Sequence, residues 1–269
     1  MVDLLRCDLK RAIKDKLFLV LCIVGGAFAV ITPLLYKALF ASLNVEVGML
    51  GLQMNARSLF FSSFSLTNNF GLILPILIAI ILCKDFSHGT VRNKIISGKS
   101  RGSIYLSLLI TCATLMCLFI LAHAVLTLLV SLIFFDYQAV PFSAQDFGYL
   151  MASLGLEMLV YLLICAILTF FIMFMKNAGL AIVMYFVVNF GMTIIGSVMQ
   201  AAMLFSNATD TVAYKLLEFL TNANVFTTTA INGTALSTPE LLALIIPNVI
   251  FTALFILLGL FAFKKKELK

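Results

Sequence analysis

Tryptophan is absent from this chain and charged residues make up only 11% of it, whereas 62% of its residues are hydrophobic. Soluble domains usually contain about 45–50% apolar and about 25% charged residues. A chain of 269 residues folded in water cannot bury so much apolar surface, so the composition excludes a soluble globular protein. Without tryptophan, any aromatic belt at a membrane surface would have to consist of phenylalanine and tyrosine.

Residues that ligate metals or carry catalysis are also scarce. The two histidines, His88 and His123, lie far apart in the sequence, and the six cysteines form no C-x-x-C pair. All cysteines except Cys7 lie in or at the end of apolar runs, where thiols usually pack as small hydrophobic groups. No H-E-x-x-H or G-x-S-x-G pattern is present. We therefore expect no metal, cofactor or catalytic residue on this chain.

Six apolar runs are long enough to cross a membrane as helices. They cover residues 17–40, 68–83, 105–135, 149–175, 179–204 and 241–263. The second run is the shortest, but its sequence GLILPILIAIILC is too apolar for any other location. We therefore expect an all-α integral membrane protein, with residues 1–269 forming a single domain of six transmembrane helices.

The distribution of lysine and arginine predicts the orientation of the six spans. An even number of spans places both termini on one side, together with the segment 84–104. Fifteen of the 18 Lys and Arg residues then fall on that side, and only Lys37, Arg57 and Lys215 fall on the other. This asymmetry is typical of the cytoplasmic side, so both termini are predicted to be cytoplasmic. The net charge of +6 consequently gives no reason to expect nucleic acid as a partner.

The leader, residues 1–16, has the pattern of an amphipathic helix. Leucines and isoleucines recur at helical spacing with lysine and arginine on the other face, and the apolar positions are Leu4, Leu5, Leu9, Ile13 and Leu17. Such a helix would lie along the inner membrane surface, although a plain positively charged anchor has the same composition. The A-x-A sequence at residues 27–29 resembles a signal-peptide cleavage site. Because the apolar run continues past it, we favour a retained membrane helix.

Two segments are predicted on the outer side, residues 41–67 and 205–240. Both are polar to mixed in composition, and the second contains the amphipathic stretch VAYKLLEFL, residues 212–220. We expect short helices at the outer interface before the last span.

The segment 84–104 contains the tripeptide Gly98-Lys99-Ser100, three letters of a nucleotide-binding P-loop. A P-loop requires G-x-x-x-x-G-K-[ST] between a strand and a helix, and Asn93 stands where the first glycine would be. A membrane helix precedes the segment where a strand would be needed. The tripeptide therefore does not predict ATP binding on this chain.

Residues 90–96 of the same segment predict a short amphipathic helix that ends near Gly98. Its apolar face would contain Val91, Ile95 and Ile96, and its polar face would contain Arg92, Asn93 and Lys94. Such a helix could rest on lipid headgroups or insert into a groove of a soluble partner.

Ionisable residues inside membrane spans are candidates for function because each is costly to place in lipid. Two occur here, His123 in the third span and Glu157 in the fourth. Both are candidates for the translocation path, although a packing role is the alternative for each. An ion-coupled transporter usually needs more buried charge than this, and no internal inverted repeat is evident.

The segment 84–104 resembles the first cytoplasmic loop of the permease subunits of ABC type-2 exporters. The resemblance rests on an acid, a Gly-Thr pair, a basic helical stretch and a Ser-Arg pair before an aliphatic helix start. These positions are Asp85, Gly89-Thr90, Arg92-Asn93, Ser100-Arg101 and Ile104-Tyr105-Leu106-Ser107. The order of leader, six spans, outer segment and basic tail is also similar. The chain departs from the family at two positions. Asp85 stands where the family commonly has glutamate, and Leu108 stands where a lysine often follows the Leu-Ser pair.

The resemblance implies a permease that binds no ATP and pairs with two copies of a separate ATP-binding subunit, which would hold ATP and magnesium. A second permease subunit, identical or related, would complete the translocation path in a bacterial plasma membrane. The helix in 84–104 would act as a coupling helix seated in the ATPase. The coupling residues so implied are Asp85, Phe86, Gly89, Thr90, Val91, Arg92, Asn93, Ile95 and Arg101.

The cargo expected from the apolar spans and the family resemblance is an amphipathic peptide of the toxin or bacteriocin type. Efflux of drugs or peptide antibiotics is the alternative within the same family. Membrane lipid is the remaining expected partner of the permease. A self-contained secondary transporter or channel is the alternative outside the family.

Overall fold

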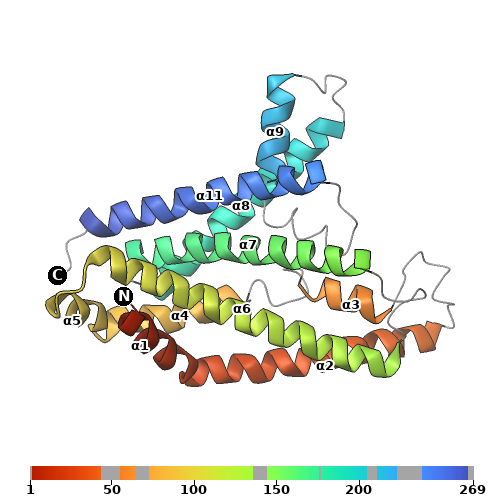
Figure 1. The fold of residues 1–269 in the computed structure, drawn as a ribbon, viewed down its shortest axis with the longest axis horizontal. Coiled ribbons are helices and arrows are strands. Elements are labelled where there is room, and N and C mark those ends of the chain that lie inside the picture. The colour runs from red at the N-terminus through yellow and green to blue at the C-terminus, as the bar shows by residue number, and fades with distance from the viewer. Residues whose placement is uncertain are drawn as a thin grey trace.

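The computed structural model describes residues 2–43, 55–64, 73–135, 144–175, 177–204, 211–222 and 238–265, and no strand occurs within these ranges. The helices (Figure 1) are α1 (Val2–Ile13), α2 (Lys16–Leu43), α3 (Ala56–Ser62), α4 (Ile73–Ser87), α5 (Thr90–Ile96), α6 (Arg101–Phe134), α7 (Ala144–Met175), α8 (Ala178–Leu204), α9 (Val212–Asn222) and α11 (Thr238–Lys265). The expected all-helical class is confirmed for the described residues.

Five helices are long and apolar enough to cross a membrane: α2, α6, α7, α8 and α11. They correspond to the first, third, fourth, fifth and sixth expected spans. Helix α4 has 15 residues and reaches spanning length only together with α5, from which it is bent by 49°. The expected second span thus includes residues 68–72, which lie outside the described ranges. The chain has the helices of a multi-pass membrane protein.

Helix α7 forms the centre of the bundle. It packs against α11 on one side and against α6, α8 and α4 on the others, while α2 packs mainly on α6. In the most apolar part of α7, 67% of the residues are buried within the protein, compared with 17% for α8. Apolar side chains on the outer faces of α2, α8 and α11 remain exposed, as expected for surfaces that contact lipid.

Two glycines allow close packing against α6. A Cβ atom at Gly25 of α2 would overlap the ring of Phe119, and one at Gly259 of α11 would overlap the ring and hydroxyl of Tyr105. Tyr105 is fully buried. The absence of a side chain at these two positions therefore allows α2 and α11 to approach α6 closely.

Helix α1, helix α5 and the end of α11 lie at the same end of the bundle, on the left in Figure 1. Helix α1 packs on the start of α6 and α5 follows α4. Local caps define the helix starts here: Asp15 Oδ1 accepts the backbone N–H of Leu17 at the start of α2, and Ser100 caps α6 through the N–H of Ser103. Such caps satisfy N–H groups that the first helical turn leaves free.

The short helices expected in the outer segments are present as α3 and α9. Helix α3 begins at a capping box formed by Asn55 and Ser58, and the hydroxyl of Tyr161 on α7 donates to the carbonyl of Phe64 just after α3. Helix α9 is held to α11, since Asn248 Nδ2 donates to the carbonyl of Asn222. Residues 44–54, 65–67, 205–210 and 223–237 of these segments lie outside the described residues.

Candidate functional site

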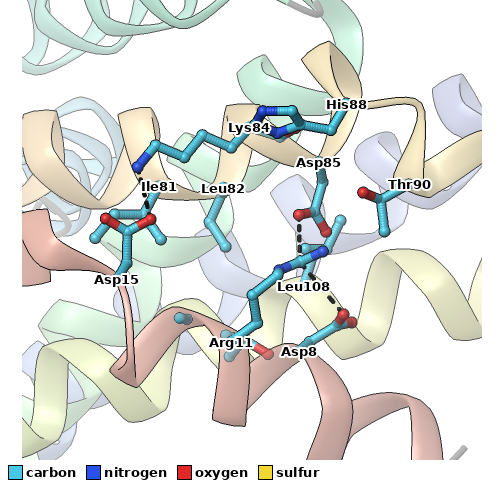
Figure 2. A pocket seen from close by; sticks show the side chains of 12 residues that line it. Asp8, Arg11, Asp15, Ile81, Leu82, Lys84, Asp85, His88, Thr90 and Leu108 are labelled. Carbon is cyan, nitrogen blue, oxygen red and sulfur yellow. Dashed lines mark hydrogen bonds and ion pairs between the residues drawn. The ribbon is translucent and has the colours of Figure 1, made fainter.

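Four charged side chains meet where α1 packs against the end of α4 and against α5. Asp8 and Arg11 come from α1, Asp85 from the end of α4 and Lys94 from α5. Figure 2 shows the Arg11 guanidinium lying between the carboxylates of Asp8 and Asp85. Together with Ser107 of α6, which hydrogen-bonds to Asp8, we call these residues the ionic cluster.

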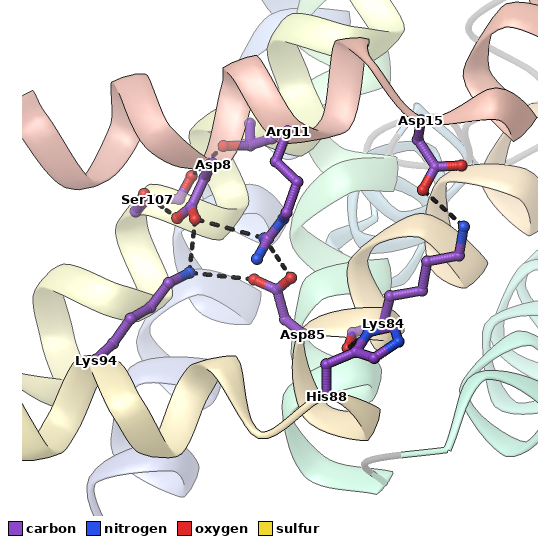
Figure 3. A network of polar contacts seen from close by, with 9 residues as sticks. Asp8, Arg11, Asp15, Lys84, Asp85, His88, Lys94 and Ser107 are labelled. Atoms are coloured by element: carbon purple, nitrogen blue, oxygen red, sulfur yellow. Dashed lines mark hydrogen bonds and ion pairs between the residues drawn. The ribbon is translucent and has the colours of Figure 1, made fainter.

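Lys94 connects the two carboxylates of the ionic cluster (Figure 3). Its Nζ lies 2.6 Å from Asp8 Oδ1 and 3.1 Å from Asp85 Oδ2. Arg11 pairs with Asp85 and lies 3.5 Å from Asp8 Oδ1. Ser107 Oγ donates to the other oxygen of Asp8 at 2.7 Å. Two acids and two bases therefore neutralise one another, and helices α1, α4, α5 and α6 are joined through a single set of contacts.

Burial makes these contacts important for the fold. The exposed fraction is 0% for Asp8, 1% for Asp85 and 9% for Lys94, whereas the side chain of Arg11 is 44% exposed. Removing one member of a buried ion pair typically costs about 3–5 kcal/mol, because the remaining charge loses its partner. The buried members of the ionic cluster consequently fix the position of α1 relative to α5.

A second ion pair lies beside the cluster. Lys84 Nζ on α4 donates to Asp15 Oδ2 at 2.6 Å, so Asp15 both caps α2 and pairs with α4. Burial opposes ionisation of Asp15, but the hydrogen bonds from Lys84 and from the N–H of Leu17, with the charges of Lys84 and Arg11, outweigh it and lower the pKa of the carboxyl. Asp15 is therefore ionised at neutral pH.

The backbone at both ends of α5 depends on glycine. Gly89, between α4 and α5, has φ +66°, and Gly98, after α5, has φ +82°. At the second position Gly98 N–H donates to Ile95 O and Lys99 N–H donates to Lys94 O, the pair of bonds that defines a Schellman motif. The Gly98-Lys99-Ser100 tripeptide thus ends one helix, and its serine caps the next. The expected helix at 90–96 with a stop at Gly98 is confirmed.

The two faces of α5 differ from the expected ones at two positions. Val91 is buried and Arg92 and Asn93 are exposed, as expected. Lys94, expected on the exposed polar face, is buried because Asp8 and Asp85 supply partners for its ammonium. Ile96, expected on the apolar face, is 73% exposed, because the buried face of α5 is centred on Val91 and Lys94. These two expectations were wrong.

The other residues that the family resemblance implies in coupling occupy different environments. Phe86 and Ile95 pack against the hydrophobic core, and Thr90 lines a cavity beside the ionic cluster. Arg101 donates through Nη1 to the carbonyls of Phe263 and Lys264, where it caps the end of α11. Asp85, Phe86, Thr90 and Val91 therefore turn inward, and Arg92 and Asn93 alone project outward among the coupling residues on α5.

The leader helix also differs from expectation in the face that it turns to the protein. Leu4, Asp8 and Ala12 are buried against the bundle, whereas Ile13 of the expected apolar stripe is 42% exposed. The helix is rotated so that its acid reaches Lys94 and Ser107. The exposed part of the apolar stripe is left on the flank of α1, where it could contact lipid.

A cavity of about 560 Å³ lies between α1, α4 and α6. Charged and apolar side chains both line its wall (Figure 2). The charged side chains on the wall are Asp8, Arg11, Asp15, Lys84 and Asp85, and the imidazole of His88 also lines it. The apolar side chains on the wall are Ala12, Ile81, Leu82 and Leu108, and Thr90 and Thr111 complete the lining.

The two intramembrane candidates lie deeper in the bundle. Glu157 on α7 is fully buried and His123 on α6 is 5% exposed, and the ring of His123 stacks on Phe119 at 6.3 Å between centroids. Both side chains face protein neighbours, so the structure does not bring them into the cavity described above. Among the described residues, no group of three or more His, Cys, Asp or Glu side chains is arranged to hold a metal ion.

Four residues of the site were not predicted from the sequence: Asp8, Arg11, Lys94 and Ser107. One signal was available, since Asp8 lies three residues before Arg11 in the leader and adjoins its apolar stripe. An acid in such a position needs a partner if it is buried. The partner on α5 is 86 residues away, and this pairing is a tertiary contact that the spacing of residues does not encode.

Residues 18–269 match a protein family described as "Protein of unknown function (DUF2705)". The match covers nearly all of the chain, and the chain belongs to this family. A comparison with curated proteins found no match.

Proposed function

We propose that this member of the DUF2705 family is the membrane-spanning permease subunit of an ATP-driven exporter of the ABC type-2 kind. In this proposal it has six spans, with α4 in the second, and both termini and α5 lie on the cytoplasmic side of a bacterial plasma membrane. ATP hydrolysis takes place on two copies of a separate subunit. Two permease chains, identical or related, form the path.

The observation that carries the proposal is the way α5 is held at the end of the bundle. Its inner face, Val91 and Lys94, is buried against the protein, and Lys94 is tied to α1 and α4 through Asp8 and Asp85. Its outer face presents Arg92, Asn93 and Ile96, all exposed. A short helix that is rigidly joined to the spans and exposes two polar side chains and one apolar side chain is suited to transmit movement from a soluble partner.

This geometry suggests different roles for Asp85, which belongs to the ionic cluster, and for Arg92, which lies outside it. Asp85 supports α5 from inside the protein, because it is 1% exposed and paired with Lys94 and Arg11. Arg92 lies on the free face and is the residue that we assign to contact with the ATPase. Helix α1, bound to α5 through Asp8, would move with it when the ATPase closes.

A charge reversal tests the docking role directly. Arg92→Glu should abolish co-purification of the tagged chain with a subunit that hydrolyses ATP, while the yield and thermal stability of the chain stay unchanged. The matched control is Lys99→Glu, which reverses an exposed charge just beyond Gly98. If the Arg92 variant retained wild-type ATPase activity and transport, the docking role would be wrong.

The proposed cargo is an amphipathic peptide, with drugs or peptide antibiotics as the alternative within the same proposal. Apolar spans with few fixed polar groups favour a cargo that partitions from the membrane. Stimulation of the ATPase of the purified complex by a panel of amphipathic peptides tests this choice. A flat response across the panel, with stimulation by lipophilic drugs, would favour the alternative.

The second candidate is a self-contained transporter. The observation that favours it is the fully buried Glu157, because acids inside membrane spans often mark proton or ion pathways. Transport by the purified chain alone in proteoliposomes, driven by an ion gradient and abolished in Glu157→Gln, would support this candidate. Transport that requires ATP and a second subunit would support the exporter.

A further inference from the structure

We propose that the cavity between α1, α4 and α6 binds the headgroup of a zwitterionic phospholipid, of the phosphoethanolamine class. The proposal rests on the cavity and on the membrane-spanning helices, and it holds whether or not the chain couples to an ATPase. The volume of about 560 Å³ lies within the range of about 300–1,000 Å³ that is usual for sites of small ligands.

The position of the cavity matches the boundary between acyl chains and headgroups. On α4 the apolar side chains of Ile81 and Leu82 are followed within one turn by Lys84 and Asp85, and all four line the cavity. The cavity therefore extends from the apolar part of α4 to its charged end. A phospholipid at a membrane surface has the same division, with apolar acyl chains on one side of a charged headgroup.

Two cations on the cavity wall have donors for a phosphate. The ammonium of Lys84 carries three N–H donors, and the bond to Asp15 engages one of them. The guanidinium of Arg11 carries five donors, and its contacts with Asp8 and Asp85 are made through Nη2. Both side chains are partly exposed, at 38% for Lys84 and 44% for Arg11, so a headgroup can reach them. Charge-assisted bonds from such donors to phosphate are among the stronger hydrogen bonds in proteins.

The charge balance selects a zwitterion over an anion. The three acids Asp8, Asp15 and Asp85 are balanced by Arg11 and Lys84 together with Lys94, which bonds to Asp8 and Asp85 behind the wall. An anionic headgroup would leave this neutral group with an excess negative charge in a partly buried place, which is unfavourable. A headgroup with one phosphate and one ammonium keeps the balance.

Among the acids, Asp15 is best placed to receive the ammonium of the headgroup. Asp8 and Asp85 are almost completely buried and hold Lys94 between them, whereas the side chain of Asp15 remains 15% exposed. A primary ammonium can donate hydrogen bonds to this carboxylate, but the quaternary ammonium of choline cannot. The site should therefore prefer phosphatidylethanolamine to phosphatidylcholine.

Lipid retention by the purified full-length chain tests the proposal. Native mass spectrometry would be used to titrate the delipidated chain with phosphatidylethanolamine, phosphatidylcholine and phosphatidylglycerol that carry the same acyl chains. We expect phosphatidylethanolamine to bind about tenfold more tightly than the other two, as expected for one or two additional charge-assisted hydrogen bonds. Equal retention of the three lipids, or a preference for phosphatidylglycerol, would overturn the proposal.

Variants locate the binding to this cavity. The double variant Lys84→Met/Asp15→Asn removes one charge of each sign, and Ala12→Leu fills the apolar wall while it keeps every charge of the cavity. Each should abolish the tenfold preference, and Arg92→Met, which removes an exposed cation outside the cavity, should keep it. An unchanged preference in both cavity variants would place the lipid elsewhere and overturn the assignment.

A soluble competitor separates the lipid from a free headgroup compound. Glycerophosphoethanolamine carries the same charges without acyl chains, so it should displace the lipid only at much higher concentration. Displacement at concentrations equal to that of the lipid would show that the apolar wall contributes nothing, and the phospholipid assignment would be wrong.

Discussion

Lys94 on α5 donates to Asp8 on α1 at 2.6 Å, and this contact joins the first helix of the chain to the short helix between α4 and α6. Both side chains are at least nine-tenths buried. Because the same ammonium also bonds to Asp85, one side chain connects three helices. The position of α5 is therefore determined by a buried polar contact in addition to apolar packing at Val91.

The first prediction concerns the strength of this contact. Asp8→Asn and Lys94→Met should each lower the free energy of unfolding, by at most about 3–5 kcal/mol, because each removes one of the partners of a buried charge. The double variant Asp8→Asn/Lys94→Met should be less destabilised than the sum of the two single variants, since Asp85 then retains Arg11. Thermal or denaturant unfolding in detergent, analysed as a double-mutant cycle, measures the coupling.

The control for this cycle is Arg92→Met, which removes an exposed cation from the same helix. It should change stability by less than about 0.5 kcal/mol. Strict additivity of the Asp8 and Lys94 substitutions would contradict the contact, and so would an equally large effect at Arg92.

How much of this arrangement the sequence predicts depends on the range of the interactions involved. The hydrophobic runs predict five of the spanning helices, and the periodicity at 90–96 predicts α5 with its end at Gly98, because these features depend on residues close together in the chain. The stretch VAYKLLEFL likewise predicts α9. Helix ends differ by a few residues, as for α6, which begins at Arg101 where the apolar run begins at Tyr105.

The site was less predictable because its contacts are distant in sequence. Lys94 is one of three consecutive polar residues, and nothing in its neighbours distinguishes it from Arg92 or Asn93; its burial depends on Asp8. The family resemblance singles out Asp85 but suggests nothing about Arg11 or Lys94 as its partners. The cavity beside them arises from the packing of α1 on α6, a tertiary arrangement.

The second prediction concerns acid pH. The lowered pKa of Asp15 means that its ion pair with Lys84 stabilises the fold at pH values above the ordinary carboxyl pKa of 3.8. This contribution is lost as the pH falls below 3.8 through the lower pKa of the folded state. Wild type should therefore be more stable than Asp15→Asn at pH 5–7, and the difference should shrink below about pH 4.

Unfolding curves of both proteins from pH 3 to pH 7 measure this difference. Lys16→Met, next to Asp15 but exposed, serves as the control and should show no such pH dependence relative to wild type. A difference between wild type and Asp15→Asn that grows on acidification would contradict the direction of the pKa shift.

The third prediction concerns the end of α5. Gly98 has φ +82° and open space around the position of a Cβ atom, so Gly98→Ala should cost about 1 kcal/mol through backbone strain alone. Gly98→Asn should cost less, since asparagine tolerates this conformation better than alanine. Gly102→Ala is the matched control because Gly102 lies in the first turn of α6, where alanine is favourable.

Thermal unfolding of these three variants tests the backbone argument. The expected order of stability is Gly102→Ala at or above wild type, then Gly98→Asn, then Gly98→Ala. A Gly98→Ala variant as stable as wild type would show that the Schellman motif does not require a left-handed residue here.

The fourth prediction concerns the contact between α11 and α6. Gly259→Ala would place a methyl group against the ring and hydroxyl of Tyr105, and Tyr105 is fully buried, so the ring cannot move aside freely. Overpacking of this kind costs about 1–3 kcal/mol. Tyr105→Phe removes the hydroxyl that is nearest to the new methyl group, so the double variant should recover part of the stability that Gly259→Ala loses.

Thermal unfolding in detergent measures these differences. The control is Gly191→Ala on α8, because nothing lies within 4 Å of a Cβ atom at that position. Equal stability losses in Gly259→Ala and Gly191→Ala would contradict close packing of α11 on α6, because the cost would then come from the helix backbone and not from Tyr105.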